Sequence, residues 1–132
     1  MSPRAPEPVG PYPHARRVRD LLFLSGIGSR VPGRDDIPGV ALGADGRVTS
    51  YDFESQCRQV FTNVRTVLED AGSSWDRIVD VTAFLTDIGR DFASFNRLYA
   101  EAFPDNRPTR TTVEVSRLPT PIAIELKVIA TI

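Results

Sequence analysis

Apolar side chains recur along the chain with two different periods, and each change of period marks an expected element. Spacings of three and four between residues 52 and 71 predict an amphipathic helix, with Asp52 and Glu54 at its start and Gly72 after its end. Alternation with a period of two predicts strands elsewhere. The expected elements, in order, are strands at 15–19 and 21–27, a helix at 52–71, a strand at 78–86, a helix at 91–103 and two strands within 110–130.

The last quarter of the chain is the most informative part, because its alternation separates apolar from charged positions. The pattern predicts a hairpin, in which a short turn with Pro119 and Pro121 joins the two strands. The apolar face would hold Val113, Val115, Ile122, Ile124, Leu126 and Val128, and the opposite face Arg110, Thr112, Glu114, Glu125 and Lys127. A polar sheet face is either a solvated surface or the floor of a site, and alternation alone leaves both readings open.

The order ββαβαββ indicates an α+β domain that spans residues 1–132, with one mixed sheet and two helices on one face. Residues 1–14 hold five of the 11 prolines and are expected to form an extended lead-in. Residues 28–47 are expected to form a long loop rich in Gly, Pro, Asp and Arg, of the kind that often carries function. The apolar run of 21–27 suits a strand that is buried on both faces.

Two helices can cover only one face of this sheet, so the other face needs a partner. It would combine the charged positions of the last quarter with Ile129 and part of the apolar strand at 21–27. We expect such a face to pack on copies of the same chain, which predicts a closed homo-oligomer with sites at subunit interfaces.

The composition of the chain limits the kinds of partner that the protein is expected to bind. Hydrophobic residues make up 41% and charged residues 25% of the chain, and the net charge is −1, so no electrostatic footprint for nucleic acid or a membrane surface is expected. No run of 18 apolar residues and no secretory signal is evident, which predicts a cytoplasmic protein. The absence of a basic stripe also argues against a ribonuclease role.

Cysteine, histidine and lysine each occur only once, which limits the catalytic and metal-binding chemistry that the chain can carry out. Cys57 is the single cysteine and lies on a helical apolar stripe, so we expect a core side chain and no internal disulfide. His14 is the single histidine and is expected at the surface. A metal site is therefore not expected, and neither is a cofactor, because the chain has no phosphate-binding glycine motif. Lys127 is the only lysine and the only Schiff-base candidate.

Several local motifs follow one another along nearly the whole chain. They are Gly10-Pro-Tyr12, Leu24-Ser-Gly26, Val79-Asp-Val-Thr-Ala-Phe-Leu85, Asp91-Phe-Ala with Asn96 and Tyr99, Pro108-Thr-Arg110-Thr-Thr-Val-Glu-Val115, and Ile124-Glu125. In this order and at these separations, they resemble the RidA (YjgF) family of enamine and imine deaminases.

The resemblance implies a chorismate-mutase-like α+β subunit that forms a homotrimer with ligand clefts between subunits, and it implies no metal or cofactor. In that reading, Arg110 grips the carboxylate of an enamine or imine through two parallel hydrogen bonds. Glu125 orients and deprotonates the attacking water and returns a proton to nitrogen. Tyr12, Ser25, Gly26, Asn96 and Thr112 would contact the substrate. From the strand pattern alone, Arg110 could instead pair with Glu114, and Glu125 with Arg110 or Lys127.

Two departures from the commonest family pattern concern the substrate. Ser25-Gly26-Ile27 replaces a Ser-Gly-Gln segment, and Thr112 replaces a cysteine. These two departures and the basic loop that follows Ile27 are similar to features of the 2-aminomuconate deaminase branch of the family. The second carboxylate of 2-aminomuconate would then bind Arg30, or less favourably Arg34 or Arg16. The alternatives are a general 2-iminobutanoate and 2-iminopropanoate deaminase, and a non-catalytic trimer that binds metabolites or acts as a chaperone.

Overall fold

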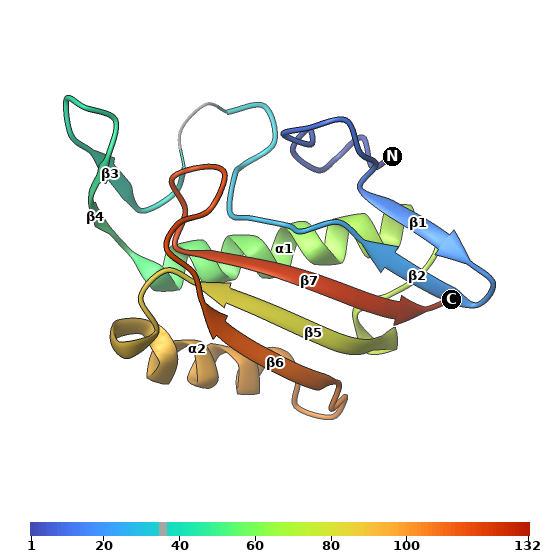
Figure 1. Cartoon of the computed structure of the whole chain (residues 1–132). Coiled ribbons are helices and arrows are strands. Elements are labelled where there is room, and N and C mark those ends of the chain that lie inside the picture. Colours follow the sequence, from blue (N-terminus) through green and yellow to red (C-terminus); the bar gives the residue numbers. More distant parts are fainter. Residues whose placement is uncertain (35–36) are drawn as a thin grey trace.

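The computed structural model describes residues 1–34 and 37–132. One five-stranded mixed sheet carries α1 (Phe53–Asp70) and α2 (Ile88–Ala102) on the same face, as expected; in Figure 1 both helices lie behind the sheet. In spatial order the strands are β1 (Ala15–Val18), β2 (Leu21–Leu24), β7 (Ile124–Thr131), β5 (Ile78–Leu85) and β6 (Thr109–Glu114). The pair β5–β6 is parallel and the other pairs are antiparallel.

The core lies between the central strands and the two helices. Along β7, Ile124, Leu126, Val128 and Ala130 are buried toward the helices, which confirms the predicted period of two in this strand. In α1, the stripe predicted from spacings of three and four is buried, Cys57 included. Burial raises the pKa of the Cys57 thiol to about 12, so this side chain behaves as a small core hydrophobe.

Side-chain caps fix where both helices begin. The Asp52 carboxylate accepts a hydrogen bond from the Glu54 amide at the start of α1, as its sequence position indicated. Helix α2 begins at Ile88, three residues before the prediction, because the Asp87 carboxylate caps the Arg90 amide. Asp91, the first residue of the predicted helix, lies in the first turn of α2, where it is buried and accepts a hydrogen bond from the Tyr51 hydroxyl.

The predicted C-terminal hairpin is wrong. Strands β6 and β7 do not pair with each other, because β5 lies between them and pairs with both. The segment β5–α2–β6 is a parallel strand–helix–strand unit, and the chain then crosses to the other side of β5 to form β7. The link between β6 and β7 spans residues 115–123 and is a loop with its own contacts, not a tight turn.

The face assigned to the first of those strands is also wrong. Arg110 stands opposite buried Val81 in the parallel register, so it lies on the face that carries the helices, and alternation places Thr112 and Glu114 there too. Val113 lies on the other face, where it is 37% exposed. Glu125 and Lys127 do lie on that open face, as predicted. Because β6 is an edge strand, its helix-side positions need not be apolar.

The loop predicted at 28–47 contains regular structure. Strand β3 (Val40–Leu42) pairs with β4 (Val48–Tyr51) in a separate hairpin that extends from the body of the molecule (Figure 1). The turn uses Gly46 with a positive φ of 80°, in an Asp-Gly pair that is a strong hairpin signal. Residues 35–36 of the predicted loop lie outside the described residues.

The open face of the sheet keeps a mixed character. Leu22 and Leu24 of β2 are buried toward the helices, whereas Leu21 is exposed and Phe23 is only half-buried. Strand β2 is therefore buried on one face, not on both as expected. The strand also ends earlier than predicted, and only an isolated bridge from Ile27 to Leu126 continues it. Among the described residues, no helix is long and apolar enough to cross a membrane.

Candidate functional site

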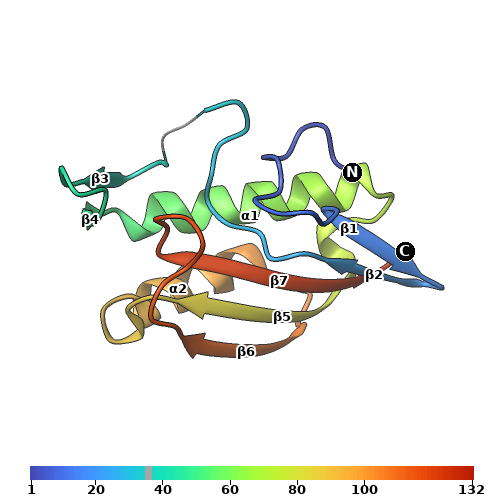
Figure 2. The ribbon, with the colours of Figure 1, turned by 45° about the horizontal axis from the view of Figure 1, so that its top comes forward.

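Three segments that are distant in the sequence enclose a pocket of about 520 Å³ of empty space, its open mouth included. They are the N-terminal segment, the stretch after β2 and the end of the β6–β7 loop, which lie together above one end of the sheet (Figure 2). The lining residues are Ala5, Pro6, Pro8, Val9, Tyr12, His14, Ser25, Gly26, Ile27, Gly28, Arg30, Pro119, Thr120, Ile122 and Glu125. Five of the predicted site residues are thereby brought together: Tyr12, Ser25, Gly26, Arg30 and Glu125.

Glu125 is the carboxylate of this pocket. Strand β7 presents it on the open face, one position after buried Ile124. A Cβ on Gly26 would lie only 2.6 Å from Glu125 Oε2, so glycine at this position leaves room for the carboxylate. Within the described residues, Glu125 has no hydrogen-bond or ion-pair partner, and burial raises its pKa above the ordinary value of 4.5. A carboxyl group with these properties is suited to proton transfer.

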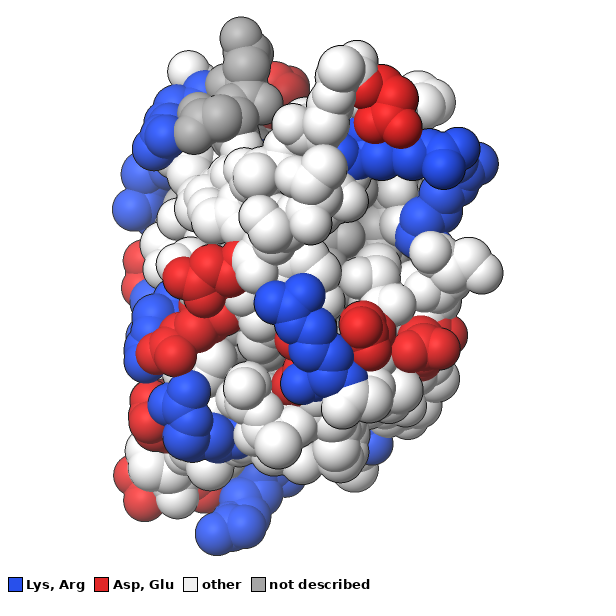
Figure 3. Space-filling view, turned by 90° about the vertical axis from the view of Figure 1, so that its left-hand side faces the viewer, with Lys and Arg blue, Asp and Glu red and all other residues white. Residues whose placement is uncertain are grey.

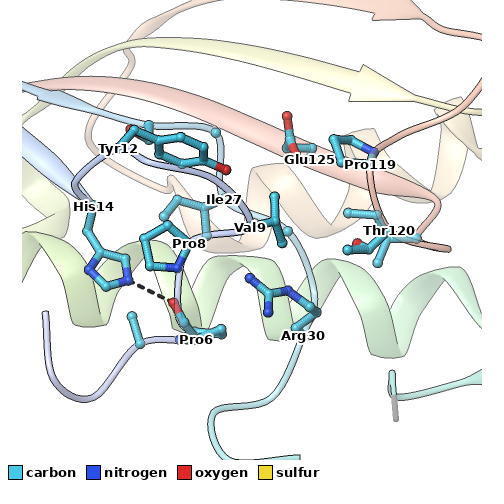
Figure 4. A pocket seen from close by; sticks show the side chains of 15 residues that line it. Pro6, Pro8, Val9, Tyr12, His14, Ile27, Arg30, Pro119, Thr120 and Glu125 are labelled. Carbon is cyan, nitrogen blue, oxygen red and sulfur yellow. Dashed lines mark hydrogen bonds between the residues drawn. The ribbon is translucent and has the colours of Figure 1, made fainter. Parts of the chain in front are cut away.

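Arg30 brings a cation to the same pocket. Its guanidinium donates a hydrogen bond to the Glu7 carbonyl, which ties the N-terminal segment to the stretch after β2. In the view of Figure 4, Arg30 lies along one side of the pocket and Tyr12 and Glu125 along the other, with Val9 and Ile27 between them. Arg16 and Arg34, the other cations considered for a second carboxylate, are not among the lining residues.

The two remaining predicted residues of this pocket are also fixed by local contacts. Ser25 donates from its hydroxyl to the Pro13 carbonyl, and its backbone N–H donates to the His14 carbonyl. Tyr12 is 40% exposed at the pocket mouth. Its ring packs against Gly10, where a Cβ would come within 2.9 Å of the ring.

His14 was expected at the surface, but this prediction is wrong, because the residue is only 5% exposed and lines the pocket. Its Nδ1 accepts from the Ser2 backbone N–H, and its Nε2 faces the Pro6 carbonyl at 2.7 Å (dashed in Figure 4). These two partners define the neutral Nε2–H tautomer. Both ring nitrogens thus hold the N-terminal segment in place, a role that sequence position could not reveal.

Arg110 lies in a second polar cluster on the other face of the sheet. Its guanidinium donates to Asn96 Oδ1 at 2.7 Å and lies over the rings of Phe92, Phe95 and Tyr99, with 4.7 Å to the Tyr99 ring centroid. No Asp or Glu among the described residues is within ion-pair distance of it. The alternative pairing with Glu114 is not observed, because Glu114 accepts a hydrogen bond from the Ile88 amide instead.

Two hydroxyl groups in this region have no hydrogen-bond partner among the residues that the structure describes. They are the Tyr99 hydroxyl and Thr112 Oγ1, and both are buried. A buried hydroxyl without a partner is costly, so each of these groups calls for an explanation, such as an ordered water. In the sequence, Tyr99 is part of the family motif and of a helical stripe of aromatic residues, and neither pattern reveals that its hydroxyl is buried.

The eight predicted site residues therefore form two groups. Tyr12, Ser25, Gly26, Arg30 and Glu125 line the pocket, whereas Arg110, Asn96 and Thr112 lie between β6 and α2. Glu125 stands opposite Phe84 and Arg110 opposite Val81. Phe84 and Val81 are three positions apart in β5, so they face opposite sides of the sheet, and Glu125 and Arg110 do as well. Glu125 also does not pair with Lys127, which donates to the Leu24 carbonyl.

Charge elsewhere on the surface is mixed. Figure 3 shows the side of the molecule that lies at the left in Figure 1, where basic and acidic side chains are interspersed. Arg58 and Arg97 form ion pairs with Glu54 and Glu101, both within each helix and between α1 and α2. No group of three His, Cys, Asp or Glu side chains that could hold a metal ion occurs in the part of the chain that the structure describes.

The fold and the pocket together define a class: a small α+β subunit with a mixed sheet, two helices on one face and a carboxylate pocket at a sheet end. The family described as Endoribonuclease L-PSP matches residues 2–132. The chain therefore belongs to this family, which is also known as the YjgF, RutC or RidA family, and the predicted family membership is confirmed.

Individual relatives agree with this assignment. A RutC family protein of Pyrococcus abyssi is 36% identical over 96% of this chain and 91% of its own length. Reactive Intermediate Deaminase A of Arabidopsis thaliana is 33% identical over 98% of this chain and 63% of its own length. The structure of E. coli TdcF with bound serine superimposes with a TM-score of 0.84 and 31% identity, covering 100% of this chain and 96% of TdcF. The chorismate-mutase-like fold is confirmed.

Proposed function

We propose that this protein is a deaminase that hydrolyses an enamine or imine bearing a carboxylate. The observation that carries the proposal is Glu125, a half-buried carboxyl group with a raised pKa and no partner among the described residues, at the wall of an open pocket. The family supports imine and enamine deamination in general, since one relative is named a reactive intermediate deaminase. The serine bound to TdcF supports a ligand of amino-acid size with a carboxylate.

The chemistry follows from these groups. An enamine first gains a proton on carbon and becomes an imine, whose protonated C=N carbon is electrophilic. Glu125 accepts a proton from water as the water oxygen bonds to that carbon, and the resulting carbinolamine carries the former imine nitrogen as an amine. Glu125 then returns the proton to nitrogen, which makes it a leaving group. The carbinolamine hydroxyl gives its proton to Glu125 as the C–N bond breaks and the C=O bond forms, so that ammonia leaves and a 2-oxo acid remains.

A complete site needs a second copy of the chain. Arg110 is suited to grip the substrate carboxylate through its planar fork of N–H groups, yet it lies on the other sheet face from Glu125. We propose a homotrimer in which Arg110, Asn96 and Thr112 of one subunit meet the pocket of the next. The exposed apolar side chains of the open face, such as Leu21 and Val113, support an interface between copies of the chain.

The proposed substrate is 2-aminomuconate, which would give 4-oxalocrotonate and ammonia in the breakdown of aromatic amines or tryptophan metabolites. A dicarboxylate asks for a second cation, and Arg30 lines the pocket across from Glu125. The other functions to be tested against it are a general 2-iminobutanoate and 2-iminopropanoate deaminase, and a non-catalytic trimer that binds metabolites or client proteins.

Arg30 provides the test of substrate choice. We expect the purified protein to accelerate loss of 2-aminomuconate absorbance together with ammonia release. Arg30→Gln should lower kcat/KM for this dicarboxylate by about tenfold, the loss of one charge-assisted contact, while turnover of 2-iminopropanoate stays within about twofold. Glutamine keeps an amide donor for the Glu7 carbonyl, so the N-terminal segment should remain in place.

The control is Arg47→Ala, which removes an exposed arginine in the β3–β4 turn and should leave both substrates unaffected. Equal effects of Arg30→Gln on the two substrates would remove the distal-carboxylate role. Rapid turnover of small imines alone would favour the general imine deaminase. Ligand binding without ammonia release from any of these substrates would favour the non-catalytic trimer.

The raised pKa of Glu125 predicts an acid limb in the pH–rate profile. A general base acts in its deprotonated form, so kcat/KM should fall as pH decreases through the pKa of Glu125, with a midpoint above 4.5. Rate measurements from pH 4 to 8 with an acid-stable enamine would locate that midpoint. An acid limb that persists unchanged in the residual activity of Glu125→Gln would assign it to another group.

The raised pKa of Glu125 makes folding stability depend on pH in the opposite direction to activity. Because burial raises the pKa of folded Glu125, the folded state binds this proton more tightly than the unfolded state, and stability decreases as pH rises through the range between the two values. Above that range the ionised carboxylate is a net cost to folding. Glu125→Gln should therefore raise Tm at neutral pH while it removes activity, a combination that a loss of fold cannot produce.

A further inference from the structure

Helix α1 carries two fully buried amide side chains within an otherwise apolar stripe. Gln56 is 0% and Asn63 2% exposed, and seven residues, about two helical turns, separate them. Buried amides are unfavourable unless they are hydrogen-bonded, and both make bonds to the chain around the pocket. Neither residue lines the pocket itself.

Asn63 fixes the stretch that carries Arg30. Its Nδ2 donates one hydrogen bond to the Gly28 carbonyl at 2.9 Å and one to the Arg30 carbonyl at 2.7 Å. Its Oδ1 accepts from Gln59 Nε2, so the amide has one orientation and uses both of its N–H groups on this stretch. The main chain of residues 28–30 is therefore held at the two carbonyls that flank Ser29.

Gln56 links this stretch to the chain that leads into Glu125. Its Oε1 accepts from the Ala123 backbone N–H at 2.7 Å and from the Ser29 hydroxyl at 3.2 Å. Ala123 stands two residues before Glu125, at the end of the β6–β7 loop. Gln56 Nε2 is buried and has no hydrogen-bond partner within the described residues, which is unfavourable for stability.

We propose that Gln56 and Asn63 are positioning residues of the site, which set the separation between the Arg30 and Glu125 walls of the pocket. This inference rests on the proposed function for its kinetic consequences. Asn63 governs the Arg30 wall and hence the distal group of the substrate. Gln56 joins both walls and hence also governs the placement of Glu125. Displacement by about 1 Å at a reacting centre is enough to change rates strongly.

Isosteric variants test the proposal. Asn63→Leu should raise KM for 2-aminomuconate by about tenfold, with kcat and small-imine turnover within about twofold, because only the Arg30 wall loosens. Gln56→Met should lower kcat by about tenfold for both substrates, since the chain before Glu125 loses its bond to α1. The control is Val60→Ala, which opens a cavity at a buried position of the same helix and should lower Tm, but removes no hydrogen bond to either wall.

Hydrogen exchange gives a second measurement that does not depend on activity. Relative to Val60→Ala at matched Tm, exchange should increase within residues 27–31 in Asn63→Leu, and within both 27–31 and 119–125 in Gln56→Met. Kinetics and exchange that match Val60→Ala would overturn the inference. An inactive wild type would refute the proposed function, yet the exchange pattern would still decide whether the two amides hold the pocket walls.

Discussion

Arg110→Ala should lower kcat/KM for any imine or enamine carboxylate by about 10²- to 10³-fold, because two charge-assisted hydrogen bonds to the substrate are lost at once. The guanidinium is prepared for this role by its surroundings. Three aromatic rings support it, Asn96 orients one nitrogen, and no acidic residue among those described competes for the others. Steady-state kinetics with 2-aminomuconate and 2-iminopropanoate measure the effect.

The pattern across variants identifies the cause. Arg110→Lys keeps the charge but loses the planar fork, so it should recover only part of the activity. Arg97→Ala removes a neighbouring arginine of α2 that pairs with Glu54 and should retain wild-type kinetics. Wild-type turnover in Arg110→Ala would refute the proposal that Arg110 binds the substrate carboxylate. Loss in Arg97→Ala of the same size would point to a general effect on α2.

The parts of the fold that follow from local pattern could be predicted. The α1 stripe and the alternation of β7 each reflect burial on one side of a regular element, and periodicity reports that directly. The face of β6 could not be read in this way. Its pairing partner is β5, and the register of Arg110 with Val81 is set by the parallel crossover through α2, which apolar alternation within β6 does not encode.

The site was predictable as a set of residue types but not as a geometry. Tyr12, Gly26 and Glu125 do meet in one pocket, while Arg110 is separated from them by the sheet. His14 shows why single residues are hard to place. Its partners are backbone groups of Ser2 and Pro6, and any residue type could supply those, so the sequence carries no sign of its burial.

That separation of Arg110 from Glu125 leads to a prediction about assembly. Arg110→Ala and Glu125→Gln proteins, each inactive alone, should regain activity when their subunits are mixed in one trimer. If a cleft takes Arg110 from one subunit and Glu125 from the next, every mixed trimer contains one cleft with both native residues. Random 1:1 mixing makes about three quarters of the trimers mixed, so about one quarter of wild-type activity should return.

The experiment co-expresses the two variants with different tags, or unfolds and refolds them together, and compares activity with each variant treated alone. Glu125→Gln mixed with itself controls for recovery on refolding. Activity that stays at the level of the separate variants would place Arg110 and Glu125 in the cleft of one subunit, or in no common cleft. Within one subunit the two side chains lie on opposite faces of the sheet, so restoration has a single physical route, through the interface between copies.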